Sequence, residues 1–181
     1  PPNRSGTSRA TPVVGSASWR PGTPIAWVKT STETPTGIWR ADWVDEKTVI
    51  VSLANSGLHR MPAGGGVLEP VTQLDKARGE VAHQRPSVLP GGRAVLFSVG
   101  VGNWHDCHVE VVSLETGHRS TIIEEAFEAQ YAASGHVLFG RDDTLFAVPF
   151  DLERLQVVGS EVAVLSPVQT DFGTGRTANF A

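Results

Sequence analysis

A short apolar run recurs along this chain at nearly constant spacing, and this repetition restricts the fold more than any other feature of the sequence. The runs cover residues 49–51 (VIV), 95–97 (VLF) and 137–139 (VLF). Each run follows a polar turn and precedes a second segment in which apolar and polar residues alternate. A period of roughly 40 to 45 residues is typical of folds that repeat one supersecondary unit.

Each repeat contains enough strand-like segments for four strands. The segments RADWV, RPSVL and QYAAS precede the apolar runs, alternating segments at 58–62, 109–113 and 145–149 follow them, and last segments begin at Leu68, Arg119 and Glu161. Helical periodicity is scarce, whereas β-branched and aromatic runs alternate with Gly, Pro, Asn and Asp turns. We therefore expect an all-β protein, a β-propeller of four-stranded antiparallel blades with about three blades present.

The same repeat predicts how the chain is divided. SASWRPGTPIAWVKT is typical of the inner hairpin of a preceding blade, and TANFA of the first strand of a following one. We expect a disordered tail at 1–15, part of a preceding blade at 16–35, blades at 36–78, 79–125 and 126–167, and the start of a following blade at 168–181. Three blades leave two open edges, so one prediction is a homodimer that forms through these edges.

Composition excludes some partners. With 15 Lys+Arg against 19 Asp+Glu and a net charge of −4, the chain lacks the basic footprint that a nucleic-acid partner requires. It contains no run of 18 apolar residues, so we expect no membrane span. The single cysteine cannot form an internal disulfide, which leaves the redox compartment open. No cofactor motif is evident, and we expect no cofactor.

Several motifs resemble a known family. PGGRAVLF is similar to the SPDGR-plus-strand motif of TolB-like, WD-repeat-like propellers, and SGLHRMP, VEVVSLETGHRSTII and DDTLFAVPFD resemble the C-terminal propeller of bacterial serine/threonine protein kinases and related sensor proteins. The resemblance implies a six-bladed propeller, of which this chain is half, that is usually periplasmic or extracellular. It also implies binding of proteins or small ligands, without shared catalytic residues. Two residues depart from the pattern: Gly91 replaces an Asp, and His59 replaces a common Trp.

The stretch GNWHDCH, residues 102–108, is the most unusual segment of the repeats. It lies between the second and third strands of the second repeat, where that repeat is longer than the other two. The resemblance implies that this connection opens on the face where propellers bind ligands at the channel mouth. A longer loop on such a face suggests a specificity element. The candidate ligand-binding residues are therefore Trp104, His105, Asp106 and His108.

The same stretch suggests a metal site or a catalytic site. In an extended strand, His105 and Cys107 would share a face while His108 points away. These two are weak metal candidates, since zinc sites use three or four protein ligands. Asp106, His83 or His118 could complete a set. An enzyme of the lyase or hydrolase class would use His105, Asp106 and His108 at the channel mouth.

Other clusters have simpler interpretations. Trp43 lies in an expected inner strand, where it would pack in the core. Glu124, Glu125 and Glu128 are expected to form a solvated face on a connection between blades. The sequence as a whole favours a non-enzymatic binding or sensor module that recognises a protein or small ligand through its loop face. The propeller enzyme is the alternative.

Overall fold

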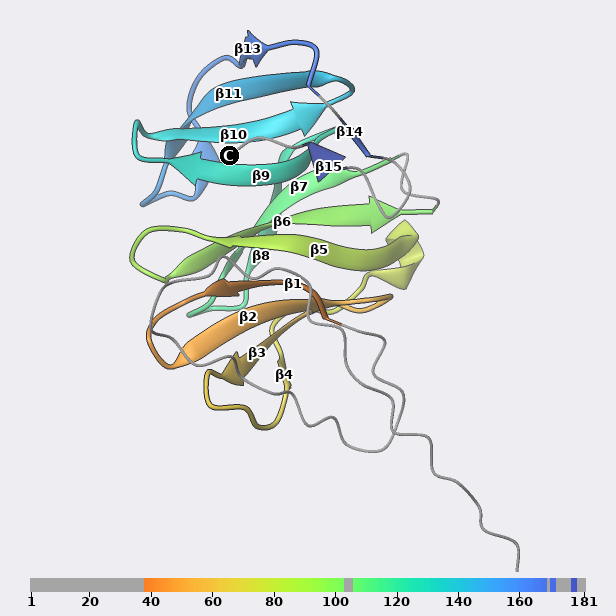
Figure 1. The fold of residues 1–181 in the computed structure, drawn as a ribbon, viewed down its shortest axis with the longest axis vertical. Helices are drawn as coiled ribbons and strands as arrows, with labels where there is room; N and C mark the ends of the chain where they lie inside the picture. The colour runs from red at the N-terminus through yellow and green to blue at the C-terminus, as the bar shows by residue number, and fades with distance from the viewer. Residues whose placement is uncertain (1–37, 103–105, 169, 172–176, 179–181) are drawn as a thin grey trace, which may run out of the picture.

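Antiparallel sheets stacked face to face build the protein (Figure 1). The computed structural model describes residues 38–102, 106–168, 170–171 and 177–178. Blade 1 contains β1 (Ile38–Trp43), β2 (Thr48–Leu53), β3 (Leu58–Pro62) and β4 (Glu69–Pro70), paired in chain order. A single 3-10 turn, η1 (Lys76–Arg78), then leads into blade 2.

Blade 2 has the same order, with β5 (Glu80–Val88), β6 (Ala94–Val101), β7 (His108–Ser113) and β8 (Arg119–Ile123). Blade 3 contains β9 (Phe127–Ala132), β10 (His136–Arg141) and β11 (Thr144–Asp151). Its outer position is shared by β12 (Gln156–Val157) and β13 (Val162–Leu165), which both pair with β11. These sheets confirm the expected all-β fold of four-stranded antiparallel blades. No helix in the described part of the chain is long and apolar enough to cross a membrane.

The predicted outer strand of blade 3 is only partly correct. Residues 162–165 do pair with β11, but β12 takes the end of β11 at Phe150 and Asp151. The expected tail and preceding blade at 1–35 lie outside the described residues. Of the expected following strand TANFA, β15 (Thr177–Ala178) is described, and it pairs with β14 (Thr170–Asp171).

Blade 2 is buried on both faces because its side chains alternate strictly. Val95, Phe97 and Val99 face blade 1 and pack with Ile50 and Leu58. The intervening residues face blade 3, where Leu96 of β6 and Val109 and Val111 of β7 pack with Val137 and Phe139. Burying each such side chain contributes about 1.5–3 kcal/mol. The apolar run of the sequence is therefore continuous because both neighbouring blades cover it.

The turn between β5 and β6 contains Gly91, one of the two residues that depart from the family pattern. Gly91 and Gly92 have φ angles of 86° and 68°, a left-handed conformation that glycine adopts with little cost. A Cβ atom on Gly92 would lie 2.8 Å from the carbonyl oxygen of Val44. Gly92 therefore allows the turn of blade 2 to approach the backbone of blade 1, whereas a Cβ atom on Gly91 would meet nothing within 4 Å.

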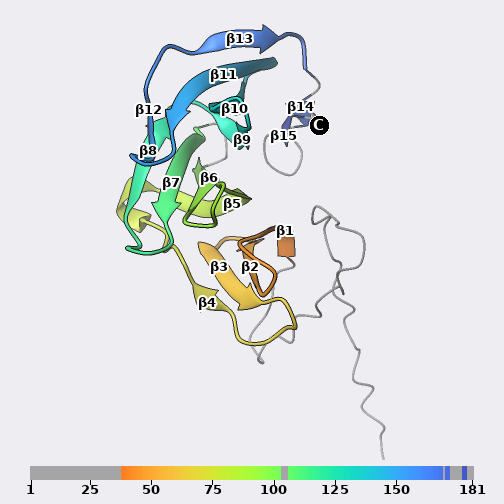
Figure 2. The same cartoon turned by 90° about the vertical axis from the view of Figure 1, so that its left-hand side faces the viewer.

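Each of the three innermost strands contains a bulge, and those of β5 and β9 lie at the same place in the repeat, opposite Phe97 and Phe139. The register shifts between Ile38 and Arg40 in β1, between Gln84 and Ser87 in β5, and opposite the Leu138/Gly140 step of β10 in β9. At the bulges of β5 and β9, Arg85 and Glu128 have φ angles of 53° and 54°. Figure 2 shows the blades arranged in an arc, with β1, β5 and β9 along its concave side.

Candidate functional site

The loop that the sequence singled out connects β6 to β7 and covers residues 102–107. It is longer than the corresponding connections of blade 1 (54–57) and blade 3 (142–143), as expected. The difference is smaller than the sequence suggested, because β6 continues to Val101. Trp104 and His105 lie outside the described residues, and Asp106 is exposed.

The two residues that follow Asp106 point into different interfaces. Cys107 is buried with Phe127, Leu145 and Val168. His108, the first residue of β7, is also buried and faces Glu110, with 3.3 Å between His108 Nε2 and Glu110 Oε1. Cys107 and His108 therefore point in different directions, whereas the face that His105 was expected to share with Cys107 lies outside the described residues.

The suggested partners of Cys107 in a metal set do not join it. His83 is buried in β5, where its ring bonds to Thr72 and Glu80. His118 is exposed in the turn between β7 and β8, at the far end of β7 from His108. Among the described residues, the side chains proposed from sequence therefore do not converge on one metal.

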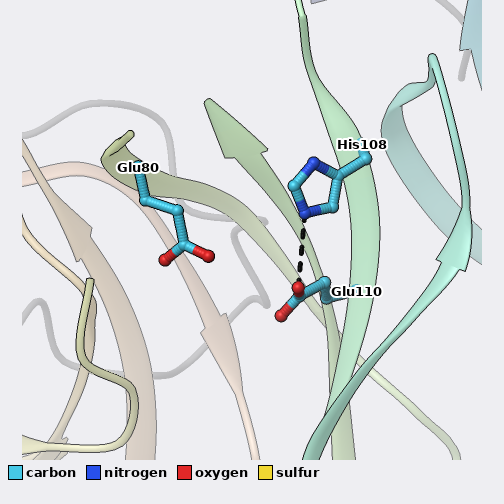
Figure 3. Close-up of side chains that lie close together, drawn as sticks. All are labelled: Glu80, His108 and Glu110. Carbon is cyan, nitrogen blue, oxygen red and sulfur yellow. Dashed lines mark hydrogen bonds and ion pairs between the residues drawn. The ribbon is translucent and has the colours of Figure 1, made fainter. Parts of the chain in front are cut away.

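The structure instead brings together a charged cluster between blades 1 and 2 that the sequence analysis missed. Glu80 of β5 faces His108 and Glu110 of β7 (Figure 3), and one ligand atom from each lies within 4.8 Å of the others. Glu80 and Glu110 are almost completely buried. Even-numbered residues of β7 face blade 1, which explains why His108 and Glu110 point the same way.

Arginine side chains neutralise both buried carboxylates. Arg119 of β8 forms an ion pair with Glu80 Oε1 through Nη2, and its Nε lies 3.1 Å from Glu110 Oε2. The second contact is an ion pair without hydrogen-bond alignment, since Oε2 makes no hydrogen bond. Arg78, which is half-exposed, lies 3.4 Å from Glu110 Oε1 and 3.9 Å from Glu80 Oε1. The two carboxylates and two guanidinium groups balance in charge.

A chain of hydrogen bonds connects this cluster to blade 1. Thr72 Oγ1 lies 2.6 Å from His83 Nδ1 and accepts a hydrogen bond from the backbone N–H of Leu58. His83 Nε2 lies 3.0 Å from Glu80 Oε2, which also accepts from the backbone N–H of Asp75 at 2.7 Å. The cluster therefore links blade 1 to blade 2.

Burial and hydrogen bonding set the protonation states. Burial alone would raise the pKa of Glu80, but hydrogen bonds from the Asp75 backbone, Arg119 and His83 outweigh it and hold the pKa below its usual value. Burial would likewise raise the pKa of Glu110, and His108 and Arg119 reverse this. Burial lowers the pKa of His83. Both carboxylates are therefore ionised near neutral pH, and His83 is neutral.

The donor set Glu80, His108 and Glu110 fits a metal poorly. Carboxylate and imidazole ligands suit divalent cations. Here, however, the guanidinium group of Arg119 already pairs with both carboxylates. A divalent cation would lie beside a guanidinium group in a cluster that is already neutral, so the ion would have to displace Arg119. The arrangement is that of a buried ion-pair network between blades.

A second charged cluster is formed by residues of β1, β5 and β9, the strands along the concave side, with Arg85 and Glu128 at bulges. Glu128 Oε1 contacts Nη1 of both Arg40 and Arg85, the latter at 3.1 Å. The backbone N–H of Glu128 donates to Ser98 Oγ at 2.9 Å. Glu128 is buried, so the expectation of a solvated Glu124–Glu125–Glu128 cluster is wrong for this residue, whereas Glu124 and Glu125 are exposed. Glu128 belongs to β9, and paired arginines compensate for its burial.

Known structures share this fold. No protein-family model matches the chain, and no curated protein matches it. A luciferin-regenerating enzyme has a TM-score of 0.56 at 6% identity, over 72% of this chain and 48% of that protein. An ancestral GH74 enzyme gives 0.54 at 10% identity, over 76% of this chain and 20% of the other. A putative TolB from Agrobacterium tumefaciens gives 0.51 at 13% identity, over 71% and 46%.

These likenesses concern the fold alone, because every identity is far below 25%. The chain spans less than half of the length of each of these structures. Two of them are named as enzymes and one as a TolB, so proteins of this fold differ in activity.

Proposed function

We propose that this chain, whose blades form part of a TolB-like β-propeller, is a non-enzymatic binding module. Its ligand, a small molecule or a segment of another protein, is held on the concave side of the blades. One observation carries the proposal: Arg40, Arg85 and Glu128 converge there from three different blades. Residues that converge from separate structural units are typical of a recognition site on a rigid scaffold.

The long loop of blade 2 belongs to the same binding region in this proposal. Its last residue, Cys107, packs against Phe127, the residue before Glu128. The end of the loop at Cys107 therefore lies close to the bulge of β9. Trp104, His105 and Asp106 would contact the ligand from this loop, and Arg40 and Arg85 would contact it from the strands.

The enzyme alternative has less support. It requires an accessible acid/base set at His105, Asp106 and His108. Of these, His108 is buried and faces Glu110, which is itself paired with two arginines. A general base must reach a substrate proton, and a side chain enclosed between two blades does not.

The resemblance to kinase-associated propellers supports a sensor role, in which ligand binding is reported to an attached domain. A homodimer through the open blade edges is compatible with this role. Part of the outer edge of blade 3 is apolar and exposed, at Val162, Val164 and Leu165. Native mass spectrometry tests the dimer, because a species near twice 19.3 kDa is expected.

The binding proposal is tested by NMR with isotope-labelled protein and a library of small metabolites and short peptides. We expect ligands to shift the signals of Arg40, Arg85, Glu128 and Asp106 together. An Asn55→Asp variant is changed in the loop of blade 1 that corresponds to residues 102–107, and it should bind these ligands as the wild type does. Turnover of any library member, abolished by His108→Ala in a protein that remains folded, would instead establish the enzyme alternative.

A further inference from the structure

The arginine pair on the concave side has an unusual charge arrangement. One carboxylate oxygen, Glu128 Oε1, faces two guanidinium groups, those of Arg40 and Arg85. The other carboxylates of the three innermost strands have partners outside this cluster. Asp42 accepts hydrogen bonds from the backbone N–H groups of Trp43 and Val88, and Glu80 belongs to the network between blades 1 and 2. The cluster itself therefore carries more positive than negative charge.

The burial of Arg85 favours the binding of a further anion to this cluster. The side chain of Arg85 is only 11% exposed and that of Glu128 4%, whereas that of Arg40 is 39% exposed. Burial lowers the pKa of Arg85 even though Glu128 opposes this shift, and Arg40 adds repulsion. A guanidinium group removed from water interacts strongly with any anion that reaches it. Access is through the side of the cluster where Arg40 is exposed.

The backbone at Arg85 and Glu128 adopts a conformation that costs free energy. Arg85 and Glu128 occupy the same position in consecutive repeats, and both have left-handed φ angles that non-glycine residues seldom adopt. Bulges of this kind change the direction of a side chain and are common beside functional sites. Strained backbone of this kind persists where the surrounding structure enforces it, and it clusters at ligand sites.

We propose that Arg40 and Arg85 bind the anionic group of a ligand, a terminal carboxylate or a phosphate, at the bulges of β1 and β5. The planar fork of a guanidinium group matches either anion. Glu128 acts as an internal counter-ion that occupies the arginines when no ligand is bound, and the ligand's anion competes with it. This inference rests on the proposed function, since it names the chemical class of the ligand at the same concave site.

Competition between Glu128 and the ligand at this site predicts larger effects of single charge changes than general electrostatic attraction does, because the general effect depends little on where the changed charge lies. Removing the Glu128 charge should tighten anion binding, whereas removing the Arg40 charge should weaken it. Arg60 provides a matched control, because it is similarly exposed (53%) and also pairs with one glutamate, Glu69, but lies on the third strand of its blade. Arg60→Gln makes the same charge change as Arg40→Gln.

The experiment is isothermal titration of the protein at low ionic strength with inorganic phosphate and, separately, with succinate. We expect the wild type to bind at least one of them, Arg40→Gln to bind at least about tenfold more weakly, and Arg60→Gln to bind as the wild type does. Glu128→Gln should bind at least about tenfold more tightly. If circular dichroism shows that this buried variant does not fold, the comparison of Arg40→Gln with Arg60→Gln decides the question. Preference for succinate or phosphate identifies which anion the ligand carries.

Equal loss in Arg40→Gln and Arg60→Gln would overturn the proposal, as would the absence of binding of both anions to the wild type. The proposed function fails separately. A neutral ligand that shifts the NMR signals of the concave site, in a protein that binds neither anion, would refute the anion proposal and retain the binding module.

Discussion

Phe146 occupies in blade 3 the position that Glu110 occupies in blade 2. Glu110 is opposite Phe97 in the register of β6 and β7, and Phe146 is opposite Phe139, the repeat equivalent of Phe97. Phe139 and Phe146 stack with ring centroids 5.6 Å apart, beneath the guanidinium of Arg141. The fold therefore tolerates aromatic packing where blade 2 has charges, so the network between blades 1 and 2 is a property of this sequence.

Removing Arg119 should destabilise the protein strongly. Arg119→Ala leaves Glu80 and Glu110 buried without their main cation, and breaking a buried pair in this way costs about 3–5 kcal/mol. The measurement is the free energy of unfolding in urea. Arg154→Ala, which removes an exposed arginine paired with Asp151, should change this free energy by less than about 0.5 kcal/mol. Similar losses in the two variants would contradict the importance assigned to the network.

Stability should fall as the pH is lowered, in two steps. The folded pKa of His83 lies below its ordinary value of 6.5, so below that pH the unfolded state binds more protons and folding weakens. The pKa values of Glu80 and Glu110 lie below 4.5, so their contribution is present above that pH and is lost as the pH falls through the folded values. Urea unfolding followed from about pH 8 down to about pH 2 measures both steps.

Substitution of His83 separates the first step from the second. In His83→Gln the decline of stability just below pH 6.5 should become shallower, whereas His118→Gln, an exposed control, should keep the slope of the wild type. His59, whose pKa is also lowered by burial, accounts for a residual slope. An unchanged slope in His83→Gln would show that His83 is not the titrating group.

Gly92 should resist substitution. Gly92→Ala places a Cβ atom 2.8 Å from the Val44 carbonyl oxygen and forces a left-handed φ on alanine, so we expect a loss of about 1–3 kcal/mol. Gly64→Ala is the control, because its Cβ would meet nothing within 4 Å. Thermal unfolding of the two variants measures the difference, and equal melting temperatures would refute the close approach of the two blades.

Cys107 should be unreactive in the folded protein. Its side chain is 3% exposed and packs with Phe127 and Leu145. Reaction with Ellman's reagent should therefore be slow in buffer and rapid in denaturing urea, since thiolate chemistry requires access. Rapid reaction under native conditions would show that the end of the 102–107 loop opens.

Much of the fold was predictable because it depends on local patterns. The 58–62 strand of blade 1 was predicted with its observed bounds, and the apolar runs at 49–51, 95–97 and 137–139 all lie in second strands. The division of the outer strand of blade 3 was not predictable, because two weak segments compete for one edge of β11. Strand type follows from side-chain alternation, whereas pairing at an exposed edge follows from tertiary geometry.

The candidate sites were harder to predict. His108 and Glu110 gave a local signal, since two polar residues at alternate positions of an apolar strand must find partners when buried. Arg85 and Glu128 could have been found by comparing equivalent positions of the repeats. The partners Glu80 and Arg119 gave no such signal, because they come from β5 and β8 and their proximity depends on how the strands of blade 2 pair.

The sequence by itself determined the repeat, the four-stranded blades and the alternation that buries both faces of blade 2, because each of these depends on residues close together in the chain. Only the tertiary structure decided which charges meet. Arg40 and Glu128 are separated by 88 residues and Glu80 and Arg119 by 39, yet both pairs are in contact. The stacking of the blades brings Arg40 close to Glu128, and the pairing of β5 to β8 in one sheet brings Glu80 close to Arg119. A linear pattern of residue types does not encode such distances.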